Sequence, residues 1–233
     1  MTYISRSFVF AFICVIILAF QVAANASDPY APPGGISATS ARLQDVLAAA
    51  RKARGADAPF STSVEEGSLS AWGLKGTFRE VVSGDDYRSV DDLGVMSFQN
   101  GRSNGQLWRR NENGLVVLLH GVHDASEIDN EALGLYLKHQ SSDLKLLGET
   151  TGASAAYVVE IHPQGGLLWW LFIDKKSYLL TRAEVPFLRE RVVYTYSDFH
   201  KTGPFTDAWH SHLSTGTSQN DVDYVTTSKK YNV

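Results

Sequence analysis

The stretch GGLLWWLFIDKKSYLLTRAEV, residues 165–185, decides the fold class. It contains seven consecutive apolar residues (167–173), then the polar stretch 174–177 and a second, partly apolar run. Seven residues are far short of the roughly 20 that cross a bilayer as a helix. Two short runs joined by turn-forming residues are typical of antiparallel strands in a hairpin. We therefore expect a sheet here and no membrane span.

The same alternation of short runs and turns continues through most of the chain after Leu69. Gly, Asn, Asp and Ser separate the runs, and turns this short make successive strands antiparallel neighbours. The sequence thus predicts a meander. The expected strands are residues 74–82, 87–93, 95–100, 105–110, 115–120, 155–162, 167–173, 178–185, 191–197, 208–213 and 222–227.

Two helices are expected beside these strands. Residues 39–54 place Leu43, Val46, Leu47 and Ala50 on one side, and residues 126–138 begin with a sequence resembling a capping box. A sheet of so many strands must curl or be covered, and two helices are too few to cover a flat one. We predict a mainly β (α+β) domain: a strongly curved antiparallel sheet with the helices in its concave side.

The first residues have the composition of an export signal. Arg6 precedes an apolar run at residues 8–20, and residues 24–26 (Ala-Asn-Ala) match the small residues after which signal peptidases cut. We expect a signal peptide at residues 1–26, a Pro- and Gly-rich linker at 27–38 and one domain at 39–233. The predicted location is periplasmic or secreted. An uncleaved anchor is the alternative.

Whole-chain composition narrows the class of protein. The 233 residues are 44% hydrophobic and 20% charged, as in globular proteins. The formal net charge is −4 and the basic residues are scattered, which argues against nucleic acid as a partner. The single cysteine, Cys14, lies inside the expected signal peptide, so a mature chain starting at Ser27 would have no thiol and no disulfide.

Histidine spacing offers a metal site as one hypothesis. His120 with His123, and His210 with His212, are spaced as zinc or iron ligands can be, with His200 as a further donor. The helical HExxH motif is missing, so solvated loop histidines are the favoured interpretation and no metal site is predicted.

Motifs for catalysis point to no reaction. Ser197, Asp198 and His200 are so close on one strand that they would point to alternate faces, which excludes a triad among them. The sequence has no P-loop, no GxGxxG after a strand and no GxSxG. The acidic pairs 65–66, 85–86 and 91–92 are expected to be solvated turn residues. We predict no enzymatic activity and no cofactor.

A series of landmarks along the chain resembles a known family. They are Gly105 to Trp108, Asn113-Gly114, Ala156 to Glu160, His162 to Gly166, Ile173-Asp174, Tyr178-Leu179, Arg182 and Tyr194 to Phe199. In this order they resemble the LolA-like proteins, which include the outer-membrane lipoprotein carriers LolA and LolB and the regulator RseB. The resemblance is closest to the LolA-like region that precedes a retropepsin-like aspartyl protease domain in some bacterial proteins.

The resemblance implies a half-open antiparallel barrel with helices and an apolar cavity in its concave side. The implied ligand is a lipid acyl chain or a lipoprotein, with a possible protein partner and only transient membrane contact. By the family register Trp169, Leu171 and Ile173 face the hollow. Trp72 and Trp108 are expected in the core, with lining of the same cavity as the alternative. The residues Leu168, Trp170 and Phe172 then face outward, as a partner surface unless another segment covers them.

Two functions follow from this reasoning and both stay open. The first is an exported, non-catalytic binding domain that holds an acyl chain or lipoprotein in an apolar cavity. The second is a protein-interaction or pro-region module associated with an aspartyl protease, whose cavity is filled by its own side chains. The first requires an accessible cavity, whereas the second predicts a plugged hollow.

Overall fold

A computed structural model describes residues 28–59, 61–84, 86–110, 113–119, 144–162, 167–187 and 190–233 of the chain. The expected signal peptide at residues 1–26 and the expected helix at 126–138 lie outside these ranges. Within them, no helix has both the length and the apolar composition needed to cross a membrane.

The described residues form one antiparallel sheet of 13 strands. The strands are β1 (Thr62–Ala71), β2 (Leu74–Ser83), β3 (Asp86–Asp92), β4 (Ser97–Ser103), β5 (Gln106–Arg110), β6 (Val116–Leu118), β7 (Leu144–Glu149), β8 (Ala156–Ile161), β9 (Trp169–Asp174), β10 (Leu180–Phe187), β11 (Glu190–Thr202), β12 (Phe205–Ser214) and β13 (Val222–Tyr231). A short 3-10 helix, η1 (Ser218–Asn220), precedes the last strand.

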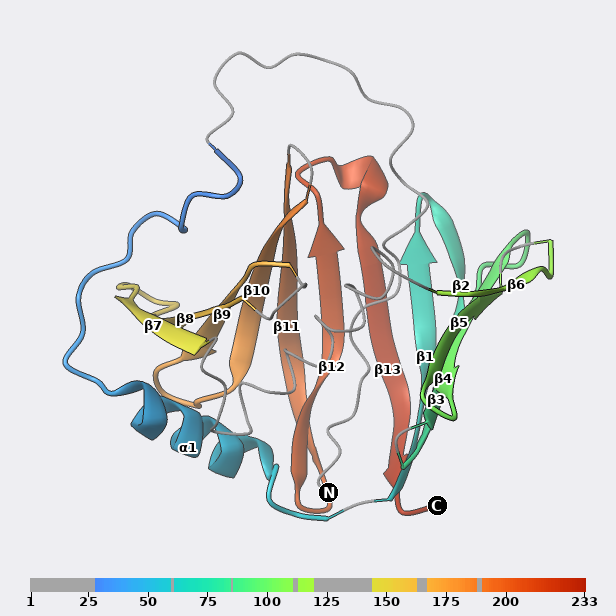
Figure 1. Ribbon diagram of the computed structural model, residues 1–233, viewed down its shortest axis with the longest axis horizontal. Coiled ribbons are helices and arrows are strands. Elements are labelled where there is room, and N and C mark those ends of the chain that lie inside the picture. Colours follow the sequence, from blue (N-terminus) through green and yellow to red (C-terminus); the bar gives the residue numbers. More distant parts are fainter. Residues whose placement is uncertain are drawn as a thin grey trace.

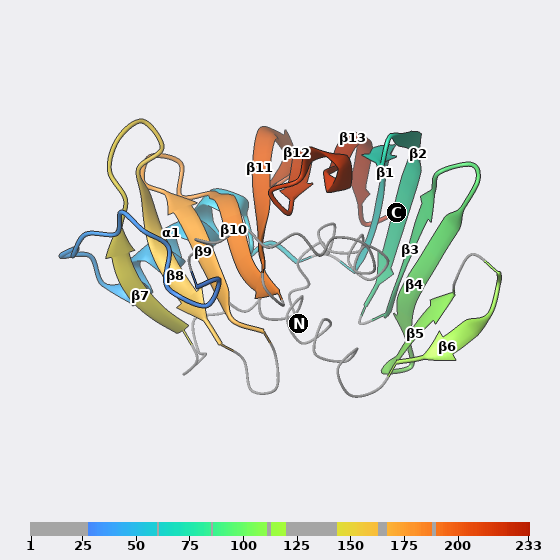
Figure 2. The same cartoon turned by 90° about the horizontal axis from the view of Figure 1, so that it is seen from above.

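The sheet is built from two meanders. Its strand order is β6-β5-β4-β3-β2-β1-β13-β12-β11-β10-β9-β8-β7, so the first and last strands of the chain pair at its centre. Short turns between successive strands produce each meander, and the pairing of β1 with β13 joins the two meanders. Figure 2 shows the sheet as an arch with β6 and β7 at its open ends. The predicted mainly β, half-open barrel is confirmed.

One helix, α1 (Leu43–Arg54), packs against one face of the sheet, which we call the helix face. It lies along the lower end of β7–β10 in Figure 1. The predicted apolar stripe is present, because Val46, Leu47 and Ala50 are buried in the main core. Buried members of that core come from nine of the strands, β1, β2 and β7–β13, and include Leu69, Phe78, Leu171 and Tyr194. Side chains that alternate with them lie on the opposite face.

Two strands were missed by the sequence prediction, and three are several residues longer than expected. β1, which begins at Thr62, was missed because two polar residues, Ser63 and Glu65, occupy core-facing positions and hide its apolar alternation. β7 carries Lys145 and an irregular register at Gly148, which hide its alternation. β11 and β13 continue to Thr202 and Tyr231, past the residues that were expected to end them, and β12 begins at Phe205, before its expected start at residue 208.

Candidate functional site

The predicted cavity residues of β9 lie in a closed part of the helix face. Trp169, Leu171 and Ile173 are 2%, 0% and 0% exposed and share a core with α1. The ring of Trp169 lies 5.6 Å from that of Tyr194 on β11. These side chains therefore contact other parts of the same chain and not solvent. Their role in ligand binding stays a prediction.

The core continues toward solvent at the other end of the helix face. Four apolar residues there are only partly buried, and they form what we call the half-buried group: Trp72, Leu74, Met96 and Phe98. The rings of Trp72 and Phe98 meet edge to face at 6.2 Å. Trp72 adopts a left-handed backbone conformation (φ 54°) in the turn between β1 and β2, which brings its side chain to this edge of the core.

A buried carboxyl lies beside the half-buried group. Asp91 on β3 is 5% exposed and is flanked in the sheet by Phe78 and Phe98. The Tyr224 hydroxyl donates a hydrogen bond of 3.0 Å to it. Burial raises the pKa of Asp91 to about 7, although the Tyr224 hydrogen bond acts in the other direction. The sequence reasoning placed this carboxyl in solvent, and that was wrong.

A second buried polar cluster joins α1 to the centre of the sheet. Lys229 Nζ lies 2.7 Å from Glu65 Oε2 and 3.6 Å from Asp207 Oδ1. Arg54, at the end of α1, lies 2.8 Å from the same Asp207 oxygen, and the Tyr231 hydroxyl donates to the other oxygen. Burial alone would raise the pKa of Asp207, but the charges of Lys229 and Arg54 hold it below its ordinary value. The cluster anchors the helix.

The face opposite α1 carries Leu168, Trp170 and Phe172, as the register predicted. Trp170 is 0% and Phe172 6% exposed, and Leu168 is partly buried, so the expectation of an exposed apolar face is corrected. Trp170 and Phe172 form a small core with residues of β8, against which Ile36 packs. The segment read as a linker thus covers this face.

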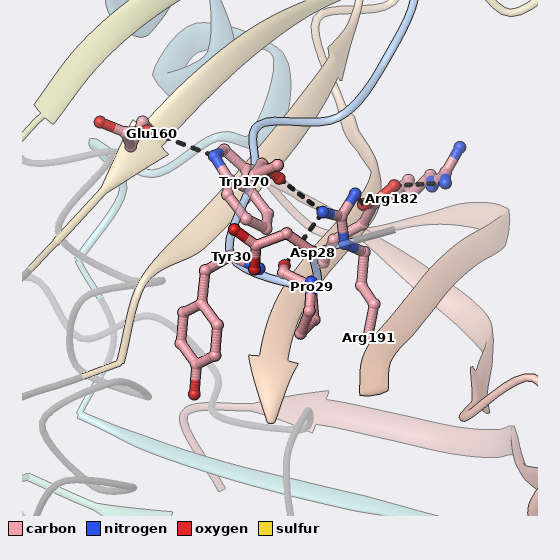
Figure 3. A network of polar contacts seen from close by, with 9 residues as sticks. Asp28, Pro29, Tyr30, Glu160, Trp170, Arg182 and Arg191 are labelled. Carbon is pink, nitrogen blue, oxygen red and sulfur yellow. Dashed lines mark hydrogen bonds and ion pairs between the residues drawn. The ribbon is translucent and has the colours of Figure 1, made fainter. Parts of the chain in front are cut away.

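Arg191 on β11 ties the N-terminal segment down, as Figure 3 shows. Its guanidinium lies over the Trp170 ring at 4.6 Å and donates to the carbonyl oxygens of Pro29, at 3.0 Å, and Ala31. It also pairs at 3.0 Å with Glu184, which is almost completely buried. Planar stacking combined with several directed hydrogen bonds is a contact that arginine makes and lysine does not.

The same segment then reaches the edge of the sheet. Ser37 exchanges two backbone hydrogen bonds with Glu149 on β7, at 2.8 and 2.9 Å. The Thr39 hydroxyl donates to the Glu149 carboxylate at 2.7 Å, and Lys175 pairs with that carboxylate at 2.9 Å. Residues 28–39 therefore pass from the opposite face, around the β7 edge, to α1.

Trp108, the remaining predicted cavity residue, lies on the opposite face. It pairs with Gly101 across β4 and β5, and a Cβ on Gly101 would lie 2.9 Å from the Trp108 ring. Its neighbour Leu107 occupies the helix-face position. The register therefore separates Trp108 from Trp72, and only Trp72 borders the main core.

The histidines of β12 form hydrogen bonds across three strands. His210 Nε2 and His212 Nδ1 lie 3.0 and 2.9 Å from one oxygen of Asp223, and Ser197 Oγ lies 3.3 Å from His210 Nδ1. Burial would raise the pKa of Asp223, but these histidine contacts lower it. Asp223 thus fixes both rings.

Among the histidines that the structure describes, no other one joins that cluster. His200 pairs with Asp198 at 2.8 Å and stacks on Trp209. His120 and His123 lie outside the described residues. Among the residues that are described, no three His, Cys, Asp or Glu side chains are grouped as metal ligands.

Comparison with known proteins gives the fold. No family model and no curated protein matches the sequence. Solved structures do match, each over 82% of this chain: a DUF1329 family protein from Desulfovibrio piger (TM-score 0.56, 16% identity, 92% of that chain), a putative outer membrane lipoprotein-sorting protein domain from Vibrio parahaemolyticus (0.54, 12%, 94%) and a LolA superfamily protein from Nitrosomonas europaea (0.56, 13%, 94%). The LolA-like resemblance is confirmed as a likeness of fold. The protease association stays a prediction.

Proposed function

We propose that this chain is an exported, non-catalytic binding protein that holds a lipid acyl chain, free or as part of a lipoprotein, on its helix face. The observation that carries the proposal is the half-buried group, four core-lining apolar residues that are only partly buried, within a fold shared with a LolA superfamily protein and a lipoprotein-sorting domain. An acyl chain laid along Trp72, Met96 and Phe98 would extend the core and gain about 0.8 kcal/mol per buried methylene.

The groups beside this site suit an amphiphile. Asp91, with a pKa of about 7, is partly neutral near physiological pH, so it repels an apolar chain less than an ionised carboxylate would. The Tyr224 hydroxyl is held by Asp91, and the Tyr224 ring meets Phe78 edge to face at 5.3 Å. Affinity in the micromolar range, about 8 kcal/mol, corresponds to about ten fully buried methylenes and needs no charged anchor.

One observation favours the second function, a protein-interaction module with a filled hollow. α1 shares the core of Trp169, Leu171 and Ile173, which leaves these predicted cavity residues 0–2% exposed. In that case the half-buried group would be only the margin of a core. The two functions therefore differ in whether apolar ligand binds at Trp72 and Phe98.

The test is native mass spectrometry of the exported protein, followed by titration with a pyrene-labelled hexadecanoic acid. Co-purified lipid, or saturable binding at micromolar concentration, supports the carrier function. Phe98→Gln should weaken binding about tenfold or more, because it puts an amide against the chain. Trp209→Gln is the matched control, since Trp209 is also half-buried but packs on His200, at 4.7 Å between the rings, and does not belong to the half-buried group.

The result that would overturn the proposal is a protein free of lipid that binds no fatty acid, or one whose binding is equally reduced by the two variants. Either result would favour the second function, a protein-interaction module with a filled hollow. Circular dichroism of each variant checks that the sheet is intact, so that loss of binding is not confused with loss of fold.

A further inference from the structure

The edge strand β6 is unusually apolar for a surface element. Four consecutive residues are exposed: Leu115 (62%), Val116 (55%), Val117 (48%) and Leu118 (52%). Side chains of a strand alternate between faces, so β6 presents apolar groups on both sides. A soluble protein normally protects such an edge with charge or proline, and a contiguous exposed apolar patch marks a contact surface.

Strands beside β6 add an indole and two guanidinium groups on the face opposite α1. Leu118 pairs with Trp108, and Val116 pairs with Arg110. Arg88 on β3 lies in the same row as Trp108, opposite Gly101, and donates to Gln99 at 2.8 Å. We call the exposed β6 residues together with Arg88, Trp108 and Arg110 the edge patch.

The charge of the edge patch is opposite to that of the whole chain. The edge patch holds two arginines, Arg88 and Arg110, and no acidic residue, whereas the complete sequence has a formal net charge of −4. Arg88 and Arg110 are exposed, and within the described part of the chain neither forms an ion pair. Both guanidinium groups are therefore available to an anionic partner.

We infer that the edge patch docks onto the surface of an anionic phospholipid membrane. Aliphatic side chains on both sides of β6 would enter the acyl boundary, Trp108 would lie at the headgroup level and the arginines would bind lipid phosphates. This combination of aliphatic, tryptophan and arginine side chains is the one that interfacial membrane contacts use. The inference concerns a surface separate from the helix face, so it goes beyond acyl-chain binding.

Two other occupants fit the edge patch less well. A second copy paired through β6 would bring identical arginine clusters near one another across the twofold axis, which is unfavourable. A peptide added as a strand would find a ladder of only three residues, Val116–Leu118, which offers few backbone hydrogen bonds. A membrane surface needs neither self-complementarity nor a long ladder.

The experiment is co-flotation of the full exported protein with vesicles of phosphatidylcholine alone and of equal parts phosphatidylcholine and phosphatidylglycerol. We expect binding to the anionic vesicles that weakens with added salt. Val116→Asp combined with Leu118→Asp should abolish flotation. Arg88→Gln combined with Arg110→Gln should lower the partition coefficient about tenfold or more. Val95→Asp, at a valine that is 80% exposed outside the patch, should bind like the wild type.

Three outcomes overturn the inference: no flotation of the wild type with anionic vesicles, equal flotation of the Val116–Leu118 double variant, or a concentration-dependent dimer that this variant dissociates. The last outcome would assign the patch to a second copy. Phe98→Gln should leave flotation unchanged while it weakens fatty acid binding, so failure of one proposal is distinguishable from failure of the other.

Discussion

The ammonium of Lys229 lies 2.7 Å from a carboxylate oxygen of Glu65, and the two side chains are 0% and 4% exposed. Thr226 donates a further hydrogen bond of 2.6 Å to the other Glu65 oxygen. Removing one member of a buried ion pair is costly, because the remaining charge loses its partner without regaining water.

Lys229→Met should therefore lower the free energy of unfolding by about 3–5 kcal/mol, since it leaves Glu65 and Asp207 without their shared cation. Urea denaturation followed by circular dichroism measures the change. Lys230→Met is the matched control at the exposed neighbouring position, where we expect a change within about 0.5 kcal/mol. Equal effects at 229 and 230 would contradict the role of the buried cluster.

Asp91 should make stability depend on pH in the direction opposite to an ordinary salt-bridged carboxylate. Its pKa is raised from 3.8 to about 7, so the folded state keeps a proton that the unfolded state releases between about pH 4 and 7. Stability from this group is present below pH 4 and falls by about 4 kcal/mol as the pH rises to 7.

Asp91→Asn isolates this effect, because the amide stays neutral and its oxygen can still accept from Tyr224. The difference in unfolding free energy between variant and wild type should grow in favour of the variant from pH 4 to 7. Urea titrations at intervals across this range measure it. A difference that is constant with pH would mean that Asp91 is ionised in the folded protein.

Gly55 should tolerate no side chain at the end of α1. Its φ is 77°, and a Cβ would lie 2.0 Å from the Pro204 carbonyl oxygen. Gly73 has the same φ of 77°, but a Cβ there meets nothing within 4 Å. Gly73→Ala should cost about 1–2 kcal/mol from the left-handed conformation alone, and Gly55→Ala about 1–3 kcal/mol more from overpacking. Thermal unfolding compares the two, and similar losses would show that the Pro204 contact relaxes freely.

Arg191→Ala should release the N-terminal segment from the sheet. The variant loses the hydrogen bonds to Pro29 and Ala31 and the stacking on Trp170. Limited proteolysis should cut residues 28–37 several times faster, and Trp170 fluorescence should shift to longer wavelength. Arg182→Ala is the control, because Arg182 also pairs with Glu184 and stacks on Phe172 without holding that segment. Equal cleavage rates in the two variants would refute this anchoring.

Hydrophobic periodicity and turn residues correctly predicted those elements that depend only on residues close together in the sequence. The apolar run at residues 167–173 and the following turn identified the β9–β10 hairpin, and the spacing of Val46, Leu47 and Ala50 identified the buried side of α1. The two faces of β9 were assigned to opposite sides correctly, since a strand alternates regardless of its surroundings.

The features that the sequence did not predict depend on contacts between distant parts of the chain. No residue close to Glu65 in the sequence indicates that Lys229 is its partner. Glu65 was therefore interpreted as a solvated turn residue although its side chain faces the core, and β1 was missed. The Pro and Gly content of residues 28–38 predicted a linker. Arg191 holds this segment through backbone carbonyl groups, which every residue has, so the amino-acid sequence gives no sign of the contact. Trp108 was assigned to the core or the cavity because aromatic residues on strands are usually buried, and the sequence does not show to which face the β4–β5 register turns it.

The seam between β1 and β13 has a consequence for how the protein folds. Thr62 donates a hydrogen bond of 2.7 Å to the Val233 carbonyl, 171 positions away. Strands β1–β6 can form hairpins as soon as they emerge, yet the inner edge of β1 finds its partner only when residues 222–231 of β13 are available. High contact order of this kind slows folding and leaves a sheet edge open to mispairing. A chain that crosses a membrane before folding would meet this delay on the far side.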